Sequence, residues 1–260
     1  MLDDLKRWIT GKHAPTGTGW DDVALWAEQR QYPFRSVPGE GFVIDGRVAG
    51  TDWRLEWGPS QRDYVHGAEL RLRAELPVNA ALQWVVMNRA LQEVMEAAMF
   101  EQAVESVQTR IDNEAPPETR WLVMFPRMPG ADMGVLRENF VAVASTRKWL
   151  ATWLQGPLPA ALAAMVTDPA VPVVLMMSRS RLTLRTALPT PDLASLQPWV
   201  RLFDTAVREA RRVATEMLPS STEPAEPADS ADPADPAEPT ESDGGSAWSA
   251  SALPEEARKA

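Results

Sequence analysis

The chain has 260 residues, of which 45% are hydrophobic and 24% are charged, and its formal net charge at pH 7 is -10. This length and composition are typical of a globular protein that buries a sizeable core. With no cysteine and only two histidines, the sequence excludes disulfide frameworks, thiolate nucleophiles, iron–sulfur clusters and zinc sites built from several histidines. We therefore expect no cofactor and no metal in this protein.

The negative charge is concentrated towards the C-terminus. Residues 219–260 contain ten acidic and two basic residues, which leaves residues 1–218 with a net charge of -2. The C-terminal segment repeats acids, prolines and alanines, and proline removes amide donors while like charges repel one another. We therefore predict a globular body over residues 1–218 and a disordered, low-complexity acidic tail over residues 219–260.

The sequence also predicts where the protein resides. Acidic residues follow Met1 where a signal peptide carries positive charge, and no apolar run of signal length follows them. The most apolar stretches, 160–166 and 171–177, are far shorter than the roughly 20 residues that cross a bilayer. We therefore expect a cytoplasmic protein without a membrane span. The nearly neutral body also lacks the basic surface that nucleic acid requires.

The first part of the body alternates predicted helices and strands. Helices are expected over residues 2–9 and over Asp21–Arg30, the second with a capping box that starts at Thr18. Asp45-Gly46 predicts a two-residue hairpin turn, because glycine tolerates the positive φ that such a turn requires. Strict alternation then predicts strands with one buried and one solvent face, at residues 53–57 and 69–76.

The next segment is ambiguous, and the second half is again mixed. A long helix is expected from about Asn79 to Val107, although Leu82–Met87 also fits a strand. Ser145 is expected to cap a helix that Gly156-Pro157 ends, and a last helix begins near Pro198. The pattern favours an α+β fold with a mainly antiparallel sheet covered by helices. The further strands are expected at 121–125, 140–144, 173–177 and 182–188, the last two as a hairpin around 178–180.

Two segments of the body resemble each other. Residues 69–77 and 181–189 match at five of nine positions, and each segment precedes a Leu-Gln dipeptide where a helix is expected. One interpretation is an internal duplication into two similar strand–helix units, with a break near residues 110–118. The other interpretation is that amphipathic strands look alike, because alternation restricts their composition.

Tryptophan is unusually frequent, with eleven residues. Trp53 and Trp57 share a predicted strand face, and Trp149 and Trp153 share a predicted helix face. An aromatic-lined ligand groove is one hypothesis, and core packing in a chain with few other aromatic residues is the alternative. Trp248 stands alone in the tail and is typical of a short docking motif for a partner protein.

The loop Ser60–His66 is the candidate for chemistry. His66 is a candidate general base near neutral pH, Asp63 would orient it, and Ser60 is the third candidate. No Gly-x-Ser-x-Gly motif surrounds the serine, and the alternative is a long hairpin connection with an exposed Arg–Asp pair. The acid-rich stretch Asp112–Glu118 lacks the spacing of a calcium loop and is expected to be a solvated loop.

Four arginines are candidates for binding. Arg71, Arg73, Arg181 and Arg185 fall at outward positions of predicted strands, so they form a basic stripe if the two strands share a sheet. The acidic tail is then a candidate for an intramolecular contact with the body, as a competitor of another anionic ligand. The alternative is that these side chains pair with neighbouring glutamates in solvent.

The sequence does not determine a function. The best-supported expectation is a non-enzymatic cytoplasmic protein-interaction or adaptor protein, with another protein as its partner and no nucleic acid. The alternative is a small-ligand binder or enzyme that uses the loop Ser60–His66. A secretion-chaperone-like role is a lower alternative, which rests only on analogy with other small acidic α+β proteins.

Overall fold

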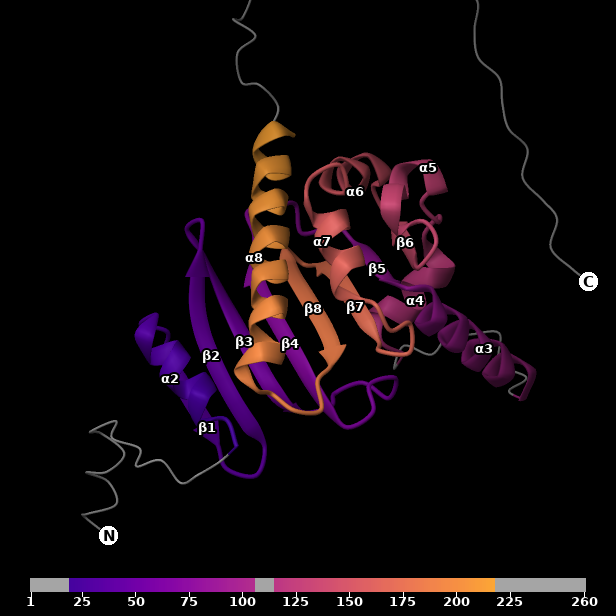
Figure 1. Cartoon of the computed structure of the whole chain (residues 1–260). Coiled ribbons are helices and arrows are strands. Elements are labelled where there is room, and N and C mark those ends of the chain that lie inside the picture. Colours follow the sequence, from indigo (N-terminus) through magenta and orange to yellow (C-terminus); the bar gives the residue numbers. More distant parts are fainter. Residues whose placement is uncertain (1–18, 106–114, 218–260) are drawn as a thin grey trace, which may run out of the picture. The chain divides into compact units, whose positions relative to one another are not determined.

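The computed structural model describes residues 19–105 and 115–217, without the side chains of 102–105, and it confirms the α+β fold (Figure 1). One eight-stranded antiparallel sheet has the order β1-β2-β3-β4-β8-β7-β5-β6. The expected helix at 2–9, the tail 219–260 and Trp248 lie outside the described residues. The strands are β1 (Phe34–Val37), β2 (Gly41–Val48), β3 (Thr51–Pro59), β4 (Ala68–Glu75), β5 (Trp84–Asn88), β6 (Phe140–Ala144), β7 (Val173–Ser178) and β8 (Arg181–Ala187).

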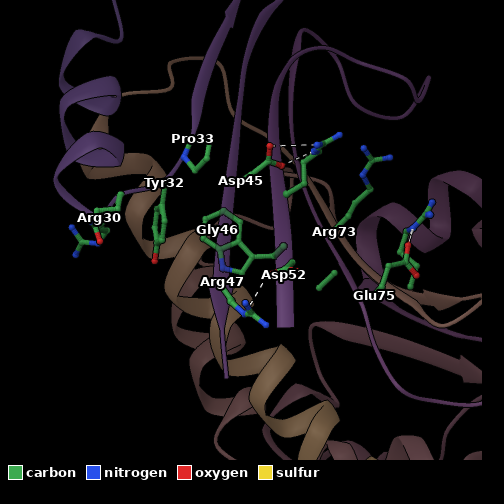
Figure 2. A pocket seen from close by; sticks show the side chains of 14 residues that line it. Arg30, Tyr32, Pro33, Asp45, Gly46, Arg47, Asp52, Arg73 and Glu75 are labelled. Carbon is green, nitrogen blue, oxygen red and sulfur yellow. Dashed lines mark hydrogen bonds and ion pairs between the residues drawn. The ribbon is translucent and has the colours of Figure 1, made fainter. Parts of the chain in front are cut away.

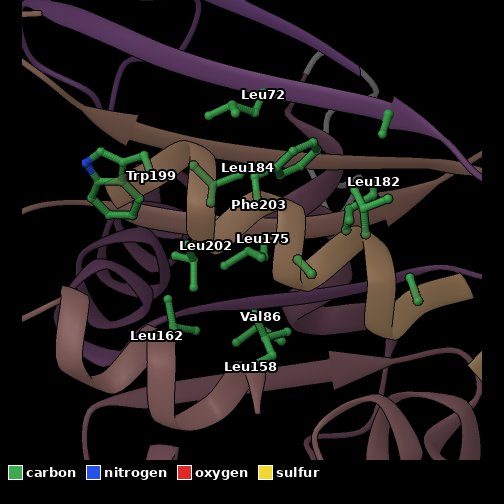
Figure 3. Packing of buried hydrophobic residues seen from close by; sticks show 14 of the residues in the cluster. Leu72, Val86, Leu158, Leu162, Leu175, Leu182, Leu184, Trp199, Leu202 and Phe203 are labelled. Carbon is green, nitrogen blue, oxygen red and sulfur yellow. The ribbon is translucent and has the colours of Figure 1, made fainter. Parts of the chain in front are cut away.

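Most of the helices cover one face of the sheet, which we call the helical face. Alternation along β4 and β8 directs Leu72 and Leu184 to this face, where they meet Phe203 and Leu202 (Figure 3). Figure 1 shows α8 crossing this face in front of β3, β4 and β8. The described helices are α2 (Asp21–Gln29), α3 (Arg89–Glu105), α4 (Pro117–Met124), α5 (Gly130–Met133), the 3-10 helix η1 (Gly134–Leu136), α6 (Arg147–Trp153), α7 (Leu158–Met165) and α8 (Leu193–Glu216).

The opposite side, which we call the second face, is divided into an apolar and a charged part. On β5, β6 and β7 it carries apolar side chains such as Val85, Val143 and Met176, which pack with Leu91 of α3 and Trp121 of α4. On β2, β3, β4 and β8 the same face carries charged residues. The second, apolar cluster therefore ends where the charged residues begin.

The first hairpin turns at a different place from the predicted one. β2 continues through Asp45 and Gly46, and the turn is formed by Ala49 and Gly50, which have φ values of 49° and 78°. Gly46 is paired with Trp53, and a Cβ at Gly46 would lie 2.2 Å from the indole ring. The glycine therefore makes room for the tryptophan, and the predicted turn at Asp45-Gly46 was wrong.

The ambiguous segment forms a strand, and one further element prediction was wrong. β5 confirms the strand alternative for Leu82–Met87, so the helix expected from Asn79 begins only at Arg89; β5 is a central strand buried on both faces and lacks an amphipathic period. The strand expected at 121–125 is instead the end of α4. Pro117 stands in the first turn of α4, where its missing N–H costs no helical hydrogen bond.

Two helix starts also differ from their predicted positions. Ser145 does not cap α6, and its hydroxyl instead accepts a hydrogen bond from the amide of Gln83 at 3.0 Å. The last helix starts before Pro198, because the Asp192 side chain accepts from the amide of Ser195 at 2.8 Å and caps α8. The predicted hairpin of β7 and β8 is present, with its turn at Arg179 and Ser180.

The two segments that resemble each other are adjacent strands. β4 and β8 pair antiparallel with Leu72 opposite Leu184, and these two leucines are also equivalent when the segments are aligned. β8 leads into α8, whereas β4 leads into β5, so the helix expected after the first segment, α3, follows only after a further strand. Strands from both sides of residues 110–118 join the one sheet. The duplication stays a hypothesis that the strands alone support.

Candidate functional site

The charged part of the second face spans four adjacent strands, and we call it the charged half-face. Pairing in register places Arg71 opposite Arg185 and Arg73 opposite Arg54, so side chains distant in sequence share this surface. All four arginines of the predicted stripe therefore lie on one face of one sheet. The half-face comprises Asp45, Arg47, Asp52, Arg54, Glu56, Glu69, Arg71, Arg73, Glu75, Arg181 and Arg185.

Carboxylates on this surface are shared between arginines. Three carboxylates each lie within ion-pair distance of two guanidinium groups, and five different arginines take part. A guanidinium carries five N–H donors, so each of these arginines keeps donors that its shared carboxylate does not occupy. The pairs are Asp45 with Arg54 (2.7 Å) and Arg35 (3.1 Å), Glu56 with Arg71 (3.1 Å) and Arg73, and Glu69 with Arg185 and Arg71 (3.9 Å).

One end of the charged half-face is buried. Arg71 and Arg185 are 9% and 8% exposed, and the fully enclosed Glu69 lies beside both. Within the described residues, Nε of both arginines and Nη1 of Arg71 lack a hydrogen-bond partner. Burial lowers the pKa of Arg71, and the charges of Glu69 and Glu56 act in the opposite direction. This end therefore holds cations whose hydrogen bonds are incompletely satisfied.

The other end of the half-face is open. It forms a groove of about 720 Å³, which we call the charged groove, and Figure 2 shows Asp45, Arg47 and Arg73 around it. The hydrogen bond to Asp45 raises the pKa of Arg54. Arginines outnumber carboxylates in the lining, which contains Arg30, Arg47, Arg54, Arg73 and Arg181 against Asp45, Asp52 and Glu75.

The loop Ser60–His66 does not form a catalytic set in the structure. The Ser60 hydroxyl closes a local turn, since it donates to the Arg62 carbonyl at 2.8 Å and accepts from the Arg62 amide at 3.0 Å. Asp63 and His66 are exposed, and no hydrogen bond joins any two of Ser60, Asp63 and His66 in the described part of the chain. The arrangement thus places no base beside a nucleophile.

A buried carboxylate that the sequence analysis did not identify as a contact residue attaches this loop to α4. Glu118, expected in a solvated stretch, is 0% exposed and accepts from Arg62 Nε at 2.5 Å and from the Tyr64 hydroxyl at 2.7 Å. Burial alone would raise the pKa of Glu118, but Arg62 and Tyr64 outweigh it and hold that pKa below its ordinary value. The loop therefore serves as a strap beside the buried end of the charged half-face.

Most tryptophans pack in the core, as one of the two interpretations expected. Trp84 stacks with Trp149 and lies 4.5 Å, centroid to centroid, from Trp153. Trp20 and Trp57 are only half-buried and line a smaller groove of about 470 Å³. The fully described buried tryptophans are Trp26, Trp53, Trp84, Trp121, Trp149, Trp153 and Trp199.

The described part of the chain holds neither a metal site nor a membrane-spanning helix. Among residues 19–105 and 115–217, no group of three or more histidines, aspartates or glutamates is arranged to hold a metal ion. Over the same ranges, no helix has the length and apolar character needed to cross a membrane.

Comparisons with known proteins do not place the chain in a family. No protein-family model matches it, and no curated protein matches it. One solved structure, the crystal structure of the mycobacterial trehalose monomycolate transport factor A, TtfA, is similar with a TM-score of 0.39 and 9% identity, over 73% of this chain and 90% of that chain. This likeness is too slight to carry a function over to this chain.

Proposed function

We propose that this chain is a non-enzymatic cytoplasmic interaction protein that binds an acidic surface of another protein through the charged half-face. The observation that carries the proposal is the excess of arginines in the open groove, where five arginines face three carboxylates, so that guanidinium donors remain for a partner. Arginine forks bind carboxylates with two parallel hydrogen bonds, so additional carboxylates from a partner complete this arrangement.

The arrangement of charges in the open groove favours a protein partner whose acidic side chains are separated from one another. Asp45, Asp52 and Glu75 lie between the arginines of the lining, so the surface alternates in sign. Closely spaced phosphates of a nucleic acid would meet these carboxylates, whereas acidic side chains of a protein can face the arginines alone. Complementary spacing of charges therefore favours an acidic protein over a polynucleotide.

The enzyme alternative receives no comparable support. Ser60 is engaged with its own loop backbone, and Arg62 and Tyr64 are engaged with Glu118. These contacts account for Ser60, Arg62 and Tyr64 as parts of a structural strap, and Asp63 and His66 stay exposed. We therefore assign recognition to the arginines and no chemistry to this loop.

The proposal is tested by binding of a fluorescein-labelled decaglutamate peptide to the full chain, measured by fluorescence anisotropy. Replacing two groove arginines in Arg54→Gln/Arg73→Gln is expected to weaken binding about tenfold, because two charge-assisted pairs are lost. The matched control Arg137→Gln/Arg147→Gln removes two exposed, ion-paired arginines elsewhere and is expected to leave the affinity within about twofold. Equal losses in the two double variants would contradict the proposal.

A further inference from the structure

Part of the outer edge of β2 lies open beside the charged groove. β1 pairs with β2 only from Gly41 to Ile44, although β2 continues to Val48. On its other edge β2 is paired with β3 from Phe42, opposite Trp57, as far as Val48, opposite Thr51. The last residues of β2 therefore have a strand on one side and no paired strand on the other, within the described chain.

The backbone groups at this open edge belong mainly to Arg47. The tight turn after Val48 directs the amide and carbonyl of Val48 and Gly46 towards β3, so those of Arg47 and Asp45 point outward. The Asp45 amide confirms this direction, since it donates outward to the Pro33 carbonyl at 3.1 Å. Pro33 has no N–H to return to the Asp45 carbonyl, so regular pairing with this segment stops there.

The open edge and the charged groove are one site. Asp45, Gly46 and Arg47 of the edge line the groove together with Tyr32 and Pro33 (Figure 2). We propose that the acidic segment of the partner binds there in an extended conformation, as an added strand paired with Arg47; this inference rests on the proposed function. Main-chain hydrogen bonds then give affinity, and side-chain contacts give selectivity.

The two faces of the sheet specify the sequence of that segment. A residue paired with Arg47 shares its face of the sheet, where Arg47 and Arg54, which are ion-paired with Asp52 and Asp45, favour a carboxylate through their remaining N–H donors. Its neighbours along the segment point to the helical face, near the rings of Trp53 and Tyr32, which lie 5.2 Å apart. The structure therefore selects alternating acidic and apolar residues.

A labelled octapeptide, four Val-Glu repeats with acetyl and amide ends, tests this mode on the full chain. Glutamates that face Arg47 turn their own amides towards β2, so N-methylation of all glutamates is expected to weaken binding at least about tenfold. N-methylation of all valines is the matched control, because those amides point away from β2, and it is expected to change the affinity less than about threefold.

The other outcomes separate this inference from the proposed function. Equal binding of the two methylated peptides would overturn strand addition and leave acidic recognition standing. Strand addition would also be overturned, and acidic recognition would stand, if the octapeptide did not bind while decaglutamate binding still depended on Arg54 and Arg73. Arg47 and Pro33 would then serve to protect a free strand edge against pairing. Loss of the dependence on Arg54 and Arg73 for both peptides would overturn the proposed function itself.

Discussion

Arg71 and Arg185 lie directly opposite each other in the pairing of β4 and β8, and each is buried against the carboxylate of Glu69. Two like charges at adjacent buried positions repel each other unless an opposite charge compensates them. Glu69 lies beside both arginines, and Glu56 adds a second carboxylate to Arg71 at 3.1 Å, so the pairing of β4 with β8 depends on Glu69 most of all at Arg185.

Glu69→Gln is therefore expected to lower the free energy of unfolding by about 3 kcal/mol, because the buried Arg185 loses its carboxylate partner and Arg71 keeps only Glu56. Urea denaturation at neutral pH measures this change. Glu75→Gln is the matched control on the same strand, since its partner Arg181 is exposed, and we expect a change below about 0.5 kcal/mol. Equal destabilisation by the two substitutions would show that burial of the Arg71 and Arg185 pair is unimportant.

Glu118→Gln is expected to free the strap formed by the loop Ser60–His66. Loss of the charge that Arg62 and Tyr64 contact should cost about 2 kcal/mol and speed amide hydrogen exchange within the loop. Tyr64→Phe removes only one neutral donor and should cost about 1 kcal/mol. Unchanged exchange in the Glu118→Gln variant would mean that other contacts hold the loop.

The stabilisation by Glu118 should also depend on pH. The folded state holds the pKa of Glu118 below its ordinary value, so its contribution is complete above the unfolded pKa of about 4.3 and is lost as the pH falls through the folded pKa. The difference in unfolding free energy between the wild type and Glu118→Gln is therefore expected to shrink below about pH 4. A difference that is constant from pH 7 to pH 3 would contradict this assignment.

Asp204 of α8 gives the opposite pH dependence. Its Oδ1 is buried without a partner among the described residues, and burial raises its pKa to about 6, which Arg208 partly offsets. Because the folded pKa exceeds the unfolded one, the wild type loses stability as the pH rises from about 4 through 6. Asp204→Asn should be about 1 kcal/mol more stable than the wild type at pH 8 and equally stable near pH 4. Denaturation at both pH values decides this, and equal stability at pH 8 would contradict it.

Gly46→Ala tests why this position of β2 is a glycine. The added Cβ would lie 2.2 Å from the Trp53 ring, so we expect a loss of about 2 kcal/mol from forced repacking. Ala49→Gly is the matched control at the true turn, where φ is positive, and it should leave stability unchanged or raise it. A neutral Gly46→Ala variant would show that Trp53 can move freely.

The sequence correctly predicted those helices and strands whose conformation is determined by their own residue pattern. The β7–β8 hairpin and α2 follow from alternation and helical spacing, and both are present. The turn at Asp45-Gly46 was wrong because the decisive contact, with Trp53 across the sheet, depends on pairing and not on turn chemistry. β5 was ambiguous because a strand buried on both faces shows neither alternation nor a helical period.

The candidate site was predictable only in part for the same reason. Outward positions of Arg71 and Arg185 follow from the alternation within each strand, but their direct opposition depends on the register of strands more than 100 residues apart. Glu118 appeared to belong to a solvated acidic stretch, because its partners Arg62 and Tyr64 are brought to it only by the fold. No local sequence signal separates this glutamate from its exposed neighbours.

The most direct test of the account is an NMR titration of the full chain with decaglutamate, which follows the side-chain Nε–Hε signals of the arginines. If the charged half-face binds acidic protein segments, the signals of Arg54, Arg73 and Arg181 should shift and saturate together. The exposed Arg137, which lies outside the half-face, should not shift. Shifts at Arg137 as large as those at Arg54 and Arg73, or no saturable shift at the groove arginines, would contradict the account.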